Sequence, residues 1–324
     1  MGMFRFFLLI LWIVSLNCKR VEDPIPEGEG MDAASQAFGK VEIIEYNESA
    51  GKGALLLTRF SSLEEFKQMV QIHYAADLKS SPGDSAGNQA VELTYSSGGR
   101  QIRSILKSGI SQADFMAARA GNFWDKVQLG LKSPYAVVHR KDLVHIENLG
   151  RRRPWVNGQG DVAFYDLAET MVWNILPEDT LTMSRKDLSE KGYLNTFNHI
   201  TAQTFMTALY SERLADFVAD VHELHNMPEL ISGTFSEEQL ADFDNGPVDN
   251  YIDMINNEWG QELGKRLREK YSICRHMIWT PVLVADLLNE IQSYQAWAFQ
   301  IGFKPFRPTD EMVIRFANKI NSGL

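Results

Sequence analysis

Cysteine and basic residues are scarce in this chain of 324 residues. Only two cysteines are present, Cys18 and Cys274, so we expect a fold that rests on its hydrophobic core rather than on a disulfide framework. Acidic residues outnumber basic ones by 42 to 32, and no basic run is longer than the three arginines at 151–153. Because nucleic-acid binding requires a basic face, we expect no nucleic-acid partner.

Motifs that identify a reaction are also missing. The sequence has no glycine-rich phosphate loop, no pair of closely spaced cysteines and no internal repeat. Hydrophobic residues make up 44% of the chain and charged residues 23%, as in a folded globular protein. A function therefore has to be argued from the arrangement of ordinary polar residues.

The N-terminus carries a short apolar run. Residues 6–16 follow a single arginine, Arg5, and such a run is too short to span a bilayer but fits the core of a signal peptide. The run leads into Ser-Leu-Asn-Cys, which ends at Cys18 and resembles a bacterial lipoprotein signal. The resemblance implies a signal peptide over residues 1–17, a lipid on Cys18 as the membrane partner, and a location in the cell envelope at the outer or inner membrane. Ordinary cleavage and an uncleaved anchor are the alternatives.

Composition changes twice after this signal. Residues 18–40 are rich in proline and glycine and poor in large apolar groups, so we expect a flexible tether there. Residues 41–150 predict a small α+β domain, and residues 160–324 predict an all-α domain. The predicted fold class is an α+β N-terminal module followed by a mainly α-helical domain.

Within the α+β module, runs of β-branched and aromatic residues predict strands. Capping residues predict helices that begin at Ser61-Ser62 and at Ser111. The first is expected to continue through Val70 and His73, and the second through Phe123 and Val127. Strands are expected at 41–46, 54–60, 90–97, 100–106, 135–139 and 143–149, with the hairpin turn of the middle pair at Gly98-Gly99.

In the second half, apolar residues recur at helical spacing. Proline is expected in the first turn of two helices, at Pro247 and Pro281, because its missing N–H costs nothing there. Thr309 is expected to cap the last helix. The other expected helices cover residues 161–175, 196–210, 211–226 and 236–243.

The helix predicted after Pro247 has a polar stripe on one side. That stripe consists of Asn250, Asp253, Asn257, Gly260 and Gly264. Each glycine costs about 1 kcal/mol relative to alanine in a helix, so a second helix is expected to approach closely and compensate. The stripe is then either a polar seam between helices or part of a ligand or catalytic site, and the two interpretations are compatible.

Candidate site residues come from three helices. His199 and His222 are 23 residues apart on neighbouring helices, and an antiparallel helix pair returns the chain so that both ends meet. Histidine and carboxylate groups bind divalent metals or form acid/base pairs. The candidate catalytic residues are His199, His222, Glu223 and Asp253. A divalent metal is a possible cofactor, with His199, His222 and Asp253 as candidate ligands, and the orienting residues are Asn226, Asn256 and Asn257.

The His-Glu-Leu-His run at residues 222–225 does not fit a zinc protease signature. That signature needs two histidines at positions i and i+4, so that both face the metal. Here the two histidines are at i and i+3. We therefore interpret His225 as solvent-facing and keep His222 as the candidate.

Taken together, these residues resemble a known pattern. The pattern N-H, then H-E-x-x-N, then D-x-x-N-N-E-x-G across about residues 195–265 resembles an uncharacterised bacterial helical domain of surface proteins and polymorphic-toxin-like chains. Asn198 stands where that domain usually has arginine. The resemblance implies a shared site but imports no established activity. The matching residues are His199, His222, Glu223, Asp253, Asn256, Asn257 and Gly260.

Two functions follow as expectations. The first is an envelope-anchored lipoprotein whose helical half is a binding or interaction module for a protein or small-molecule partner. The second is a metal-dependent or acid/base-dependent envelope hydrolase with its site on the helical domain. Metal content and a shared location of the candidate side chains discriminate between the two.

Overall fold

The computed structural model describes residues 53–74, 90–97, 99–275 and 277–323. The predicted signal peptide, the lipidation site Cys18, the tether and the strand expected at 41–46 lie outside these residues. The described residues belong to one compact unit. None of their helices is both long and apolar enough to cross a membrane.

A three-stranded antiparallel sheet forms the β part of the fold. Its order is β1 (Val70–Tyr74), β2 (Ala90–Ser97), β3 (Arg100–Lys107), and Tyr95 pairs with Val70 on one side and Ile102 on the other. The predicted pairing of the two strands that flank residues 98 and 99 is confirmed. Helix α1 (Leu63–Met69) precedes the sheet, and Ser62 caps it by accepting a hydrogen bond from Glu65 N, as predicted.

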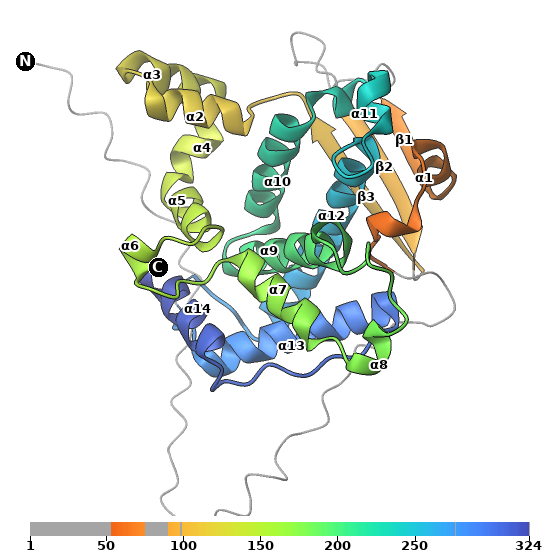
Figure 1. Cartoon of the computed structure of the whole chain (residues 1–324). Coiled ribbons are helices and arrows are strands. Elements are labelled where there is room, and N and C mark those ends of the chain that lie inside the picture. The colour runs from red at the N-terminus through yellow and green to blue at the C-terminus, as the bar shows by residue number, and fades with distance from the viewer. Residues whose placement is uncertain (1–52, 75–89, 98, 276, 324) are drawn as a thin grey trace, which may run out of the picture. The chain divides into compact units, whose positions relative to one another are not determined.

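The rest of the described chain is mainly helical, so the predicted fold class is confirmed. Helix α12 contacts both the sheet and helix α9 and lies between them (Figure 1). The helices after the sheet are α2 (Gln112–Ala120), α3 (Phe123–Lys132), α4 (Pro134–Val138), α5 (Arg140–Leu149), α6 (Pro154–Asn157), α7 (Phe164–Asn174), α8 (Pro177–Thr180), α9 (Asn195–Leu209), α10 (Glu212–Asn226), α11 (Glu237–Ala241), α12 (Pro247–Lys270), α13 (Pro281–Phe299) and α14 (Glu311–Ser322), with short 3₁₀ or π turns η1 (Leu57–Arg59), η2 (Glu190–Leu194) and η3 (Pro228–Ile231).

Two predicted strands were wrong. Residues 135–139 and 143–149 belong to helices α4 and α5. Ser133 caps α4 by accepting a hydrogen bond from Ala136 N, and Pro134 occupies the first turn. In α5 the buried residues stand at helical spacing, which the strand prediction overlooked because short apolar runs fit both periods. They are Asp142, His145, Ile146 and Leu149.

Other boundaries also differ from the prediction. The first helix ends at Met69, and the residues after it pair with β2 as strand β1. The strand expected at 54–60 is a buried segment that contains η1. The single helix expected from Ser111 through Val127 is two helices, because it breaks before Asn122, which caps α3. The last helix is capped at Asp310 instead of Thr309.

Helices α9 and α12 approach closely at the two glycines of the polar stripe. A Cβ atom on Gly260 would lie 2.7 Å from Gln203 Cβ, and one on Gly264 would lie 2.7 Å from the Thr204 carbonyl oxygen. The Thr204 hydroxyl donates a hydrogen bond to the Gly260 carbonyl at 3.0 Å. The predicted close approach is confirmed, and it brings the polar side chains of the two helices together.

Replacing Gly260 with alanine is expected to destabilise the protein by about 1–3 kcal/mol, because the added methyl overpacks a rigid helix contact. Chemical denaturation measures the change. The matched control is Gly130→Ala in α3, where the new Cβ meets only a Val137 methyl at 3.3 Å. Equal free energies of unfolding for the two variants would contradict the close packing of α9 and α12.

Candidate functional site

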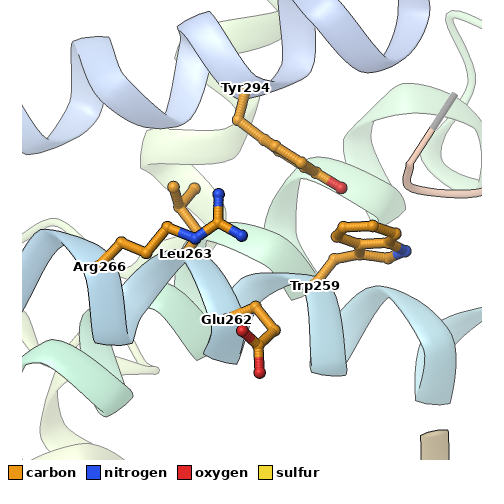
Figure 2. Close-up of a pocket in the computed structure, with 5 residues that line it drawn as sticks. All are labelled: Trp259, Glu262, Leu263, Arg266 and Tyr294. Atoms are coloured by element: carbon orange, nitrogen blue, oxygen red, sulfur yellow. The ribbon is translucent and has the colours of Figure 1, made fainter. Parts of the chain in front are cut away.

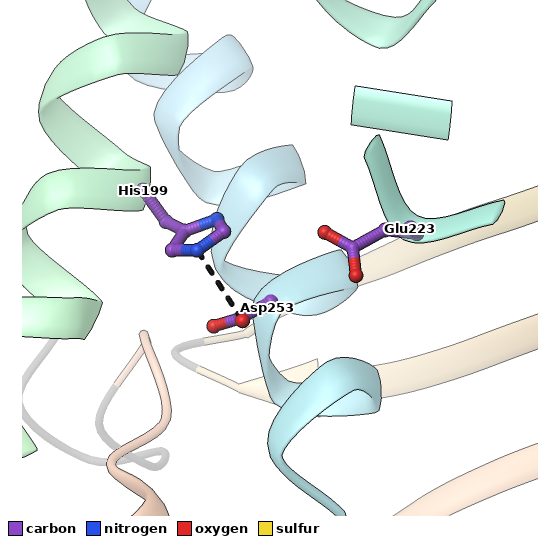
Figure 3. Close-up of side chains that lie close together, drawn as sticks. All are labelled: His199, Glu223 and Asp253. Carbon is purple, nitrogen blue, oxygen red and sulfur yellow. Dashed lines mark ion pairs between the residues drawn. The ribbon is translucent and has the colours of Figure 1, made fainter. Parts of the chain in front are cut away.

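Three helices bring one histidine and two carboxylates together. His199 comes from α9, Glu223 from α10 and Asp253 from α12, and one ligand atom of each lies within 4.8 Å of the others (Figure 3). Helices α9 and α10 are joined by a two-residue link at 210–211. The chain therefore turns back on itself, as predicted, and the rings of His199 and His222 lie 6.4 Å apart between centroids.

His199 is oriented by contacts on both ring nitrogens. Its Nδ1 lies 2.9 Å from the Asn257 side-chain oxygen, and its Nε2 lies 3.2 Å from Asp253 Oδ2. Because an amide oxygen only accepts hydrogen bonds, Nδ1 carries a proton and Nε2 faces Asp253. Burial lowers the pKa of His199, with the Asn257 hydrogen bond opposing this shift. The imidazole is therefore held neutral, with the Nε2 lone pair directed at the cluster.

Asp253 is buried and holds a proton unusually tightly. Burial raises the pKa of this carboxyl to about 7, against the lowering effects of the Lys191 charge and the Asn195 hydrogen bond. Asn195 Nδ2 donates to Oδ1 at 2.9 Å, which leaves Oδ2 for His199. A proton between Asp253 Oδ2 and His199 Nε2 satisfies both groups in the absence of another ligand.

Glu223, unlike His199 and Asp253, has no hydrogen-bond partner for its side chain among the described residues. Its side chain is directed at the other two residues of the cluster (Figure 3). The residue is 1% exposed, and neither carboxyl oxygen has a hydrogen-bond partner among the described residues. Burial and the nearby charges of Asp253 and Asp249 raise its pKa well above the ordinary value. A buried carboxylate without a partner is strongly unfavourable, so this position requires either a proton or a cation.

A row of further polar residues continues from the cluster. Lys191 Nζ lies 2.6 Å from Asp249 Oδ2, and Asn195 Nδ2 bridges Asp249 and Asp253 at 3.4 and 2.9 Å. Lys191, Asn195 and Asp249 were not among the predicted site residues. A signal was present for two of them, because Asn195 precedes His199 and Asp249 precedes Asp253 by one helical turn.

The remaining candidate residues lie around the cluster in different roles. His222 is exposed at the rim, and Asn226 Nδ2 donates to its Nε2 at 3.0 Å. Although the residue reaches solvent, partial desolvation of its ring and the nearby His199 lower the pKa of His222. Asn257 holds His199, whereas Asn256 uses both ends of its amide on the backbone of Leu55, at 2.8 and 2.9 Å. Asn256 thus attaches the segment before η1 to α12 and does not point at the cluster.

The cluster has the composition of a divalent-cation site. Zinc and similar ions bind imidazole nitrogen and carboxylate oxygen at about 2.0–2.2 Å, which places tetrahedral ligand atoms about 3.4 Å apart. The contact of 3.2 Å between His199 and Asp253 already matches this separation. The ligand atoms of the cluster lie within 4.8 Å of one another, so Glu223 would have to approach by up to about 1.4 Å. In metal sites, hydrogen bonds from neighbouring residues orient the ligands. Here Asn257 holds His199 Nδ1, and the Asn195 amide donates to Asp253.

A shallow depression between α12 and α13 carries no site. Its lining residues are shown in Figure 2, and it encloses essentially no volume because their side chains fill it. The apolar side chains of Trp259 and Leu263 are buried in the core. This depression is therefore part of the packing between α12 and α13. The cluster of His199, Glu223 and Asp253 lies at the opposite, polar side of α12.

No protein-family model, curated protein or solved structure matches this chain. The resemblance of residues 195–265 to a bacterial helical domain stays a prediction that rests on the residues quoted for it.

Proposed function

We propose that the helical half of this protein is a binding module that holds a divalent cation between His199, Glu223 and Asp253. One observation carries the proposal: the Glu223 carboxyl is buried, has no hydrogen-bond partner and faces two other potential ligands. A cation at this point supplies the missing partner for Glu223. It also replaces the proton between His199 and Asp253.

The chemistry of the three groups favours a first-row divalent ion. Neutral imidazole suits zinc, iron and nickel, and carboxylates suit these ions as well as manganese. Two carboxylates neutralise the charge of one divalent ion, so the bound site carries no net charge in the protein interior. Cation binding must release the protons that Glu223 and Asp253 hold at neutral pH, and affinity is therefore expected to rise with pH.

Elemental mass spectrometry of the purified protein tests this proposal. About one transition metal per chain is expected, lost in His199→Ala and in Asp253→Ala because each variant removes a ligand. Glu237→Ala in α11 is the control, since it removes an exposed carboxylate elsewhere. A protein without metal after incubation with zinc or manganese, or variants that keep it, would leave the polar stripe as a packing seam.

We propose further that this module is carried by a lipoprotein of the cell envelope. The support is the apolar run of residues 6–16 followed by Cys18. Growth with a labelled fatty acid is expected to label the protein in the membrane fraction. The Cys18→Ala variant is expected to remain unlabelled, and equal labelling of that variant would reject lipidation at Cys18.

A hydrolase is the second candidate, favoured by the position of His222. Three protein ligands leave coordination positions open for water and substrate, as in catalytic metal sites. The exposed imidazole of His222 stands beside His199 at the rim, and Asn226 orients it. Hydrolysis of p-nitrophenyl esters or phosphates that requires the metal and falls sharply in His222→Ala would favour this function. Full metal occupancy without any turnover would favour the binding module.

A further inference from the structure

A surface cavity of about 270 Å³ lies where Lys191 ends the polar row. Its wall carries three cationic side chains, those of Arg185, Lys186 and Lys191, and one carboxylate, that of Asp244. With Lys191 paired to Asp249 at 2.6 Å, three cations and two carboxylates leave a local net charge of +1, in a protein whose net charge is −10. This local reversal of charge favours an anionic ligand.

Two of these cations are not neutralised by the protein. Arg185 and Lys186 form no ion pair with a carboxylate in the described part of the chain, whereas Lys191 is paired with Asp249 at 2.6 Å. The Lys186 ammonium lies 4.9 Å from the centroid of the Phe243 ring, which also lines the cavity. The charges of Arg185 and Lys186 are therefore available to a ligand.

The loop that carries these cations is fixed by a buried carboxylate. Asp187 is 2% exposed, accepts hydrogen bonds from the Thr58 hydroxyl and from Ser184 N, and lies 3.6 Å from an Arg59 nitrogen. Although burial opposes the effect, the hydrogen bonds from Thr58 and Ser184 keep the pKa of Asp187 below its ordinary value. Asp187 is thus committed to its own partners and stabilises the loop around the cavity.

We propose that this cavity binds the phosphate group of a small phosphorylated ligand. Arg185 and Lys186 both line the cavity, and guanidinium and ammonium groups donate the charge-assisted hydrogen bonds that phosphate oxygens accept. The Phe243 ring forms an apolar wall for the organic part of the ligand. The position of Asp244 on the same wall disfavours a ligand with many negative charges and favours a single phosphate group.

Lys191 connects this cavity to the cation cluster. The residue lines the cavity, its ammonium group pairs with Asp249, and its charge acts to lower the pKa of both Glu223 and Asp253. A phosphorylated ligand in the cavity would therefore lie at the end of the polar row that begins at the proposed cation. The link between the phosphorylated ligand and the cation rests on the proposed function. Phosphate binding by the cavity does not depend on it.

Titration calorimetry of the cation-free full-length protein, kept in chelator, tests the inference with inorganic phosphate and phenyl phosphate. Saturable binding is expected, tighter for phenyl phosphate because of the Phe243 wall. The double variant Arg185→Gln, Lys186→Gln is expected to weaken it at least about tenfold, since charged hydrogen bonds are lost. The matched control is Arg100→Gln, Lys304→Gln, which removes the same two charges from exposed positions outside the cavity.

The control double variant distinguishes a specific phosphate site from general attraction of phosphate to positive charge. Equal weakening in both double variants, or no saturable binding of either phosphate, would overturn the proposal. Binding to inorganic phosphate and to vesicles that contain phosphatidic acid, but not to phenyl phosphate, would assign the phosphate to a lipid headgroup. The Asp253→Ala variant is expected to keep phosphate binding, so a failure of the cation site and a failure of the phosphate site give different results.

Discussion

Replacing Glu223 with glutamine is expected to stabilise the cation-free protein while abolishing cation binding. The carboxyl is buried without a partner, and the charges of Asp253 and Asp249 act on it unfavourably. Glutamine has nearly the same shape and no charge, so the variant is expected to gain about 1–2 kcal/mol of unfolding free energy at about pH 8. Affinity for zinc or manganese should fall at least about 100-fold, because outer contacts alone are worth 10–100-fold.

Urea denaturation and a zinc titration of the same variant measure both effects. Glu237→Gln is the control, because Glu237 is exposed in the first turn of α11 and should change neither quantity. A Glu223→Gln protein that is less stable than the parent would mean that Glu223 has a structural partner. Unchanged zinc affinity would show that the carboxylate is not a ligand.

The cation-free protein is also expected to lose several kcal/mol of stability as the pH rises from about 6 to about 8.5. Burial raises the pKa of Asp253 and of Asp249 to about 7, and raises that of Asp220 and of Glu258 to about 8. A carboxyl with a raised folded-state pKa contributes stability that is full below its unfolded-state pKa, falls as the pH rises between the two pKa values, and is gone above the folded-state value. For one group, a displacement from 3.8 to about 7 corresponds to about 4 kcal/mol.

The histidines act in the opposite direction at lower pH. Burial lowers the pKa of His199, and partial desolvation of its ring lowers that of His222, so their contributions are present above the ordinary value of 6.5 and are lost as the pH falls through the folded-state values. Two histidines offset only part of the loss from four carboxyls below about pH 6.5, so the fall in stability is expected to be steepest just above that pH. Denaturation curves across this range measure the profile. Saturating zinc should flatten the fall above pH 7, and a cation-free stability that increases from pH 6 to 8.5 would contradict the account.

The residue types in the site could be predicted from the sequence, because helical spacing alone places them. His199, Asp253 and Asn257 were identified from positions four residues apart and from the return of the chain between two helices. The partner of Asn256 could not be predicted in this way. It is the backbone of Leu55, 201 residues away, and no local pattern encodes a contact over that separation.

The missed elements have a common physical cause. Residues 135–139 and 143–149 were predicted as strands because short apolar segments fit the spacing of a strand as well as that of a helix. The valines of these segments favour a strand more strongly than the cap at Ser133 favours a helix. The segment 70–74 was assigned to the preceding helix because its apolar residues continued the helical face, whereas pairing with β2 decides its structure. Tertiary contacts thus override local preference where the elements are short.

Diffraction from crystals grown with zinc, with data collected at the zinc absorption edge, locates a divalent cation bound by His199, Glu223 and Asp253. We expect one anomalous peak about 2.0–2.2 Å from His199 Nε2 and from a carboxyl oxygen of each acid. An empty cluster at saturating zinc, with Glu223 still without a partner, would contradict it.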